Sequence, residues 1–199
     1  MSRLITNAIR STSASADAIT FDNSGKPAFP NGGAGKILQV VQTFKNDTAS
    51  TSSGSYADIT GFTVSITPSA TSSKILYSGH LYLGFTSAEA TFRLTRTVGG
   101  TATEIGNASV VDDDLDGAFA IGGGSQYSPA TFSFLDSPNT TSAITYGLKW
   151  HMHSGTMYLN RTWDANAFHG ASSITAMEVA AVSYTHLRAH ETSLHLVCR

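Results

Sequence analysis

The chain has 199 residues, of which only 13% are charged, and its formal net charge at pH 7 is −2. Ser and Thr contribute 26 and 25 residues, about a quarter of the whole. This composition excludes a basic surface for nucleic-acid binding, and it favours short strands and turns over helices, whose exposed faces carry many Glu, Lys and Arg. The single Cys excludes an intrachain disulfide, and no apolar run approaches the roughly 20 residues that span a bilayer.

Residues 1–35 form a polar leader with few apolar side chains. The Asp-Asn-Ser-Gly step at 22–25 predicts a turn between two short strand-like pieces, 18–21 and 26–30. So few apolar residues cannot build a core alone. We therefore expect an extended attachment segment that becomes ordered by winding with copies of itself or by docking on a partner. The alternative is a flexible linker.

Residues 36–182 form the body, in which apolar and polar residues alternate. In the runs 62–67 and 144–153 every second residue is apolar, which is typical of strands with one buried face. Gly99 and Gly100 separate two such runs and predict a tight hairpin. The connections are too short for crossover helices, so we expect antiparallel pairing of roughly eight to ten strands. The predicted fold class is all-β, an antiparallel β-sandwich with jelly-roll architecture.

Residues 183–199 break both the composition and the alternation of the body. The run 183–192 closely resembles translated sequencing-adapter read-through, which ends many metagenomic reading frames. We therefore interpret this tail as non-native, which would leave the natural C-terminus truncated near Val182, and set it aside. The residues set aside include a zinc-type ligand set, His186, His190, His195 and Cys198.

Several runs of the body carry recurrent motifs: 35–41, 63–76, 134–138, 140–143, 158–162 and 172–178. With them, the body over about 36–180 resembles a domain common in marine and metagenomic bacteriophage genomes. The leader is similar to segments that precede such domains in tail-fibre-like proteins. The resemblance implies a virion structural protein, above all a tail fibre or its receptor-binding tip. Trimeric jelly rolls of the complement and tumour-necrosis-factor kind are similar in how few strands they use. This is an analogy of fold alone.

An acidic loop offers one candidate metal site. Asp112, Asp114, Asp116 and Gly117 match the first half of a calcium-binding loop, in which oxygen ligands alternate and Gly makes the bend. Position twelve would be Gly123 where such a loop has a bidentate Glu, and no helix flanks it. A solvated acidic loop is the alternative interpretation.

A second candidate metal site lies on a predicted strand. His151 and His153 are two residues apart, so both side chains are expected to point to one face. In a homotrimer, such a pair near the axis would supply six imidazoles to an octahedral transition metal. The alternative is two exposed histidines on the polar face opposite Trp150 and Met152.

An aromatic and hydrogen-bonding cluster follows the turn at 154–155 and is the candidate site for ligand or receptor contact. Aromatic rings stack on sugars and anchor protein partners, while amides and carboxylates bind hydroxyl groups. The candidate contact residues are Tyr158, Asn160, Arg161, Trp163, Asp164, Asn166 and His169, joined by Gln126 and Tyr127 of a glycine-rich loop. The alternative is that the tryptophans belong to the core and the polar residues to ordinary loops.

Catalysis is not expected. No Gly-x-Ser-x-Gly elbow occurs, and nothing in the sequence pairs two carboxylates across a cleft. The leading hypothesis is a phage virion protein, a tail fibre or receptor-binding tip that adheres to a glycan or protein of the host surface. The expected partners are two further copies, making a homotrimer, and other virion tail proteins. The alternatives are a capsid decoration or assembly module and a carbohydrate-binding β domain.

Overall fold

The computed structural model describes residues 8–9, 19–21, 23–25, 27–28, 36–86, 89–107, 117–121, 127–164 and 167–181. The chain divides into two compact units, one formed by Met1–Ala34 with Val182–Arg199 and the other by Gly35–Ala181. All regular secondary structure in the described residues is β. Within these ranges, no helix has the length and apolar character needed to cross a membrane.

The first unit contains three short antiparallel strands, β1 (Ala8–Ile9), β2 (Ile19–Phe21) and β3 (Pro27–Ala28), in the order β1-β2-β3. Between β2 and β3, Gly25 has a positive φ of 79°, which a glycine adopts without strain. The turn expected at 22–25, with a strand piece on each side, is therefore confirmed.

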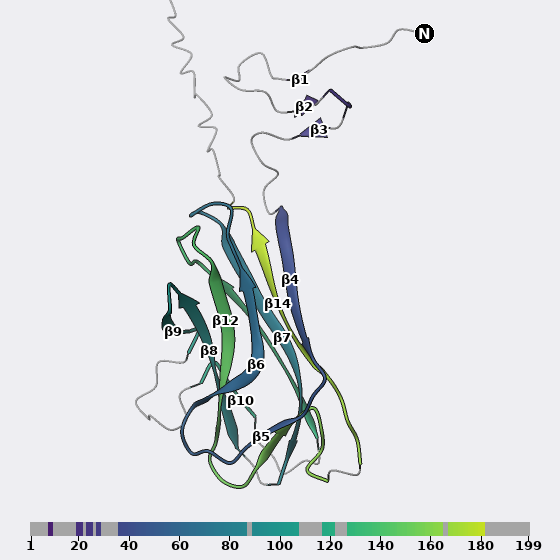
Figure 1. The fold of residues 1–199 in the computed structure, drawn as a ribbon, viewed down its shortest axis with the longest axis vertical. Helices are drawn as coiled ribbons and strands as arrows, with labels where there is room; N and C mark the ends of the chain where they lie inside the picture. Colours follow the sequence, from purple (N-terminus) through teal and green to yellow (C-terminus); the bar gives the residue numbers. More distant parts are fainter. Residues whose placement is uncertain are drawn as a thin grey trace, which may run out of the picture. The chain divides into compact units, whose positions relative to one another are not determined.

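The second unit is built from eleven described strands that form two antiparallel sheets (Figure 1). They are β4 (Ile37–Lys45), β5 (Ala49–Thr51), β6 (Ala57–Ile66), β7 (Lys74–Phe85), β8 (Ala90–Val98), β9 (Thr101–Ile105), β10 (Phe119–Ile121), β11 (Ser128–Asp136), β12 (Ile144–Met152), β13 (Met157–Leu159) and β14 (Ser172–Val179). The count exceeds the expected eight to ten because β5, β10 and β13 are additional strands of only three residues each.

The eight longer strands pair as nested hairpins. The first pairs with the last (β4 with β14), the second with the seventh (β6 with β12), the third with the sixth (β7 with β11), and the middle two with each other (β8 with β9). One sheet therefore has the order β4-β14-β7-β11 and the other β6-β12-β8-β9. This double Greek-key arrangement is a jelly roll, so the predicted fold class is confirmed.

The side chains of alternate residues point inward and fill the space between the two sheets. Phe62, Val64 and Ile66 are buried while the residues between them are exposed. At the innermost hairpin, Gly99 and Gly100 have φ values of 57° and 83°, the positive pair that a two-residue hairpin turn needs. The strands predicted from the alternation and the turn predicted from the glycine pair are therefore confirmed.

A column of aromatic rings runs through the core and joins the sheets. Phe92 stacks on Phe119 with centroids 4.7 Å apart, and Phe119 lies 5.5 Å from Phe132. Phe132 meets Tyr77 edge-on at 4.9 Å, and Tyr77 stacks on Tyr146 of the opposite sheet at 5.0 Å. Offset and edge-to-face pairs of this kind stabilise a core beyond the burial of their area.

The column ends at a buried ion pair. The hydroxyl of Tyr146 donates to Oδ2 of Asp136 at 2.7 Å, and Nη1 of Arg96 contacts both carboxylate oxygens at 2.8 and 3.0 Å. Burial, together with the carboxylate of Asp136, raises the pKa of Tyr146 well above its ordinary value of 10. The buried phenol and carboxylate therefore satisfy one another, and Arg96 neutralises the charge.

A second buried carboxylate closes the end of the sandwich where β4 begins and β14 ends. Oε1 of Glu178 accepts hydrogen bonds from the backbone and hydroxyl of Ser69 and from the hydroxyl of Ser73, and Oε2 accepts one from Gln39. Burial raises the pKa of this group, but the four hydrogen bonds favour its ionised form and hold the pKa at about 2, below the ordinary 4.5. Glu178 thereby ties the β6–β7 loop and β4 to the last strand.

Because the folded pKa of Glu178 lies below the unfolded one, its contribution to the free energy of unfolding is complete above pH 4.5 and is lost as the pH falls toward 2. The shift corresponds to about 3 kcal/mol at neutral pH. We expect Glu178→Gln to destabilise the protein at pH 7 and the difference from wild type to shrink below pH 4.5, measured by urea unfolding across pH. Asp58→Asn, which changes an exposed carboxylate on β6, is the matched control. A difference independent of pH would contradict this role.

Candidate functional site

β13 ends earlier than the alternation suggests, and a loop begins there. The run 157–163, which follows the turn at 154–155, is one of the strands that we predict for the body, whereas the structure ends this strand at Leu159. Asn160 has a φ of 63°, a left-handed conformation that a strand cannot contain and that Asn tolerates better than most residues. The extension of the predicted strand is therefore wrong, and the residues after 160 form a loop that leads to β14.

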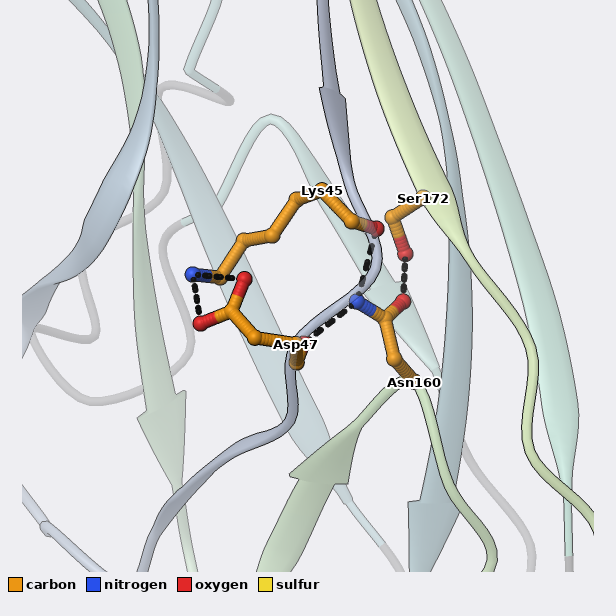
Figure 2. A network of polar contacts seen from close by, with 4 residues as sticks. All are labelled: Lys45, Asp47, Asn160 and Ser172. Atoms are coloured by element: carbon orange, nitrogen blue, oxygen red, sulfur yellow. Dashed lines mark hydrogen bonds and ion pairs between the residues drawn. The ribbon is translucent and has the colours of Figure 1, made fainter.

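Asn160 anchors this loop through its side chain (Figure 2). Its Nδ2 donates to the carbonyl oxygens of Lys45 and Asp47 at 2.9 and 2.8 Å, and its Oδ1 accepts from the hydroxyl of Ser172 at 2.6 Å. The backbone N–H of Tyr82 in turn donates to Ser172 Oγ at 3.0 Å. Since Asn160 is completely buried, its expected role in ligand contact is corrected: it positions the loop and does not face solvent.

The loop lies on the outer face of β7, where two glycines permit close contact. A Cβ on Gly84 would come within 2.5 Å of the carbonyl oxygen of Arg161. A Cβ on Gly170, at the other end of the loop, would come within 2.5 Å of the ring of Tyr82. A larger residue at either position would lift the loop from the sheet, so these glycines set where the loop residues stand.

Three large aromatic side chains are exposed around this loop. Trp163 is 47% exposed and Phe168 63% exposed, while Tyr127, which is 54% exposed, stacks parallel to Tyr82 with centroids 6.1 Å apart. We call Tyr82, Tyr127, Trp163 and Phe168 the aromatic surface. Its members come from β7, the segment before β11 and the β13–β14 loop. The alternative that Trp163 is a core residue is therefore wrong, whereas Trp150 is buried.

The remaining predicted contact residues are placed in three ways. The guanidinium of Arg161 lies 3.8 Å from the centroid of the Tyr158 ring, and Arg161 forms a β-bridge with His169. Asp164 and His169 are exposed. Gln126 and Asn166 lie outside the described residues. The side chains of Tyr127, Trp163, Asp164 and His169 are thus exposed, whereas the buried Asn160 holds the loop from inside.

The predicted metal ligands are placed differently from one another. Asp112, Asp114 and Asp116 lie outside the described residues, as does the tail. His151 is buried, with its ring 5.1 Å from that of Tyr56 and its Nδ1 3.4 Å from the hydroxyl of Thr91, so the alternative that both histidines are exposed is wrong for His151. His153 follows the end of β12 and is exposed. Across the part of the chain that the structure describes, no group of three His, Cys, Asp or Glu is placed to hold a metal ion.

The outer face of the β4-β14-β7-β11 sheet carries a second feature, a row of apolar side chains. Val40, Met177, Leu76 and Leu135 are register partners in sequence across the four strands. Val40 and Leu135, at the two ends of the row, are 55% and 56% exposed. We call these four residues the apolar row. It lies toward the end where β4 begins, and the aromatic surface lies toward the opposite end.

The two outer faces of the sandwich differ in charge. The outward residues of β4, β14, β7 and β11 between the apolar row and the aromatic surface are Gln, Thr, Ser, Phe and His. The outer face of the other sheet carries Arg93 and Lys149, both paired with Glu104 at 3.0 and 3.3 Å. The uncharged face is the one on which desolvation by a partner would cost least.

These features define an antiparallel jelly-roll sandwich in which one outer face carries the apolar row toward one end, the aromatic surface toward the other, and uncharged side chains between them. Among solved structures, the chain is similar to a chain in the structure of the infectious bursal disease virus Gx strain, at 14% identity and a TM-score of 0.37. The alignment covers 83% of this chain and 43% of that one, so this chain spans less than half the length of that protein. No protein-family model matches the sequence, and no curated protein is similar to it.

We expect Asn160→Ala to lower the free energy of unfolding by about 3 kcal/mol, because two backbone carbonyls and the Ser172 hydroxyl lose their partner in the interior. Asn160→Gly loses the same hydrogen bonds but accepts the positive φ, and should cost about 1 kcal/mol less. Urea unfolding of both variants measures these differences. Equal stability of wild type and Asn160→Ala would show that the network does not hold the loop.

Proposed function

We propose that this chain is a structural component of a virion whose jelly-roll body adheres to the host surface through the aromatic surface, without catalysis. The observation that carries the proposal is the exposure of Trp163 and Phe168 on a loop that Asn160 anchors from below, together with the exposed Tyr127, which stacks on Tyr82. Fixed aromatic side chains bind a partner at low cost in conformational entropy, as an adhesion site requires.

The position of the aromatic surface supports this role. The backbone N–H of Ala180 donates to the carbonyl of Lys36 at 2.9 Å, so the chain enters and leaves the body at one end of the sandwich. The loops around β5 and β13 lie at the opposite end (Figure 1). A module that is attached at one end and carries its contact surface at the other suits a fibre tip or a receptor-binding domain.

The chemistry of the aromatic surface fits a glycan or protein partner of the host cell. Ring faces stack on the C–H groups of sugars, and Asp164 and His169 stand exposed on the same loop for hydroxyl groups. A virion presents many copies, so weak single contacts would add to firm attachment. The sequence resemblance to phage tail-fibre-like proteins leads to the same role, and to a location in the virion.

A second candidate function, capsid decoration or assembly, is favoured by the apolar row. A row of four apolar side chains across a sheet face suits contact with another virion protein or another copy. We propose that three copies associate through this row. The row itself carries no charge, so the rows of two copies meet without like-charge repulsion, and their burial compensates for the absence of disulfides.

We expect Trp163→Ala and Phe168→Ala to weaken binding to host-surface material at least tenfold, about 1.4 kcal/mol, with little change in melting temperature. Binding of the labelled full chain to marine bacterial isolates and to an array of bacterial polysaccharides measures the effect. Thr103→Ala, an exposed position on β9, is the control and should bind like wild type. Absence of binding to every probe would contradict adhesion and favour the assembly role.

We expect Val40→Asp and Leu135→Asp to dissociate the proposed trimer, because a charge within an apolar contact loses its hydration. Sedimentation should change from about three times the chain mass of 20.9 kDa to that mass. Thr103→Asp places the same charge on the other sheet and should leave the trimer intact. A monomeric wild-type protein at micromolar concentration would refute the proposed association.

A further inference from the structure

The outer face of the second sheet contains a hollow of about 210 Å³. We call it the threonine hollow because five of its lining residues are Thr: Thr60, Thr63, Thr95, Thr97 and Thr145, with Asp58, Gly61, Gly147 and the strand segments at Ile59 and Leu148. It lies on β6, β12 and β8, so it is separate from both the aromatic surface and the apolar row. Its residues include none of the predicted contact residues.

An irregularity in β6 creates the hollow. Gly147 of β12 is the partner of Thr63, but Lys149 is the partner of Asp58, so four residues of β6 face a single residue of β12. Gly61, within the extra segment, has a φ of 70°, which places it in the left-handed region. The part of β6 that lines the hollow therefore coincides with the stretch in which its regular pairing with β12 is interrupted.

Gly147 forms the floor. A Cβ at this position would lie 3.1 Å from the hydroxyl oxygen of Thr95 and 3.3 Å from the methyl group of Thr63. Any side chain on Gly147 would therefore fill the space between the two threonines. Glycine in the middle of a strand costs stability, and such a glycine often marks a place where something approaches the backbone closely.

The hollow presents polar atoms that the described residues leave unused. The hydroxyls of Thr60, Thr63, Thr95 and Thr97 make no hydrogen bond within the described part of the chain, and neither does the carboxylate of Asp58. The nearby cations are engaged, since Lys149 and Arg93 both pair with Glu104, and Lys45, whose Nζ would lie 3.6 Å from a Cβ on Gly61, pairs with Asp47. Hydroxyls, methyl groups and one carboxylate therefore meet in a small space without an available positive charge.

We infer that the threonine hollow binds a single neutral sugar residue. Its volume lies below the roughly 300–1,000 Å³ of sites for drug-sized ligands, which limits the occupant to one small ring. Threonine hydroxyls and the Asp58 carboxylate bind the hydroxyls of a sugar, threonine methyls contact its C–H groups, and the unpaired carboxylate repels an anion. The inference rests on the proposed adhesion and assigns to it a second contact, for a terminal glycan residue.

The test uses the full chain labelled with ¹⁵N and four probes, glucose, galactose, mannose and N-acetylglucosamine. We expect at least one probe to shift the amide signals of Thr63, Thr95 and Gly147 saturably, with a dissociation constant of about 1 mM, as suits a small open site. Gly147→Ala should weaken this binding at least tenfold by filling the floor, and Thr95→Val should weaken it by removing a hydroxyl without changing shape. Thr103→Val, outside the hollow, should have no effect.

Two outcomes would overturn the inference: no saturable shift of these amides with any of the four sugars, or saturable shifts that Gly147→Ala leaves unchanged while the protein stays folded. The first result leaves adhesion through the aromatic surface intact if Trp163→Ala still abolishes cell binding. Conversely, sugar binding in the hollow with no cell binding by wild type would support the site and contradict the proposed function.

Discussion

The register of the nested strand pairs is the constraint on which the rest of this structure depends. Side chains alternate between the two faces of a sheet, so a slip of one residue exchanges every buried group for an exposed one. In β7, such a slip would bury Ser78 and His80 and expose Tyr77 and Leu81. β7 pairs with β14, β11 and β13, so its register determines theirs. The stacking of Tyr77 on Tyr146, at the end of the aromatic column, then aligns the opposite sheet with β7.

The same alternation that fills the core also divides the outside of the molecule into two different surfaces. On one sheet the outward positions between the apolar row and the aromatic surface are uncharged, and Lys74 lies beyond the apolar row. On the other sheet, threonines surround Gly147 in the threonine hollow, and Glu104 forms ion pairs with the neighbouring Arg93 and Lys149. The first surface suits contacts that exclude water, and the second suits a hydrated, hydroxyl-bearing ligand. The proposed adhesion and association surfaces therefore share one sheet, and the proposed sugar site lies on the other.

Much of the fold could be predicted from the sequence because its signals are local. The alternation at Phe62–Ile66 predicts a strand directly, and the Gly99–Gly100 pair predicts a hairpin turn directly. The environment of the individual side chains could not be predicted, because it depends on neighbours far apart in the chain. Asn160 resembles a ligand-contact residue until Lys45 and Ser172 are seen to enclose it, and His151 resembles a surface residue until Tyr56 covers it. Glu178 showed no local signal at all, since its donors lie more than a hundred residues away.

The pairing of β4 with β14 affects how this protein is made. On the ribosome, the first long strand of the body emerges well before its partner, and the edge of β7 that β14 will cover also stays bare until the last strand of the body is synthesised. Contacts between such distant segments make folding slow, and unpaired strand edges are where neighbouring nascent chains join. On β4, the exposed Val40 and Phe44 make such joining more favourable. In polysomes, where copies emerge side by side, folding of the body therefore competes with aggregation through these exposed apolar groups and unpaired strand edges.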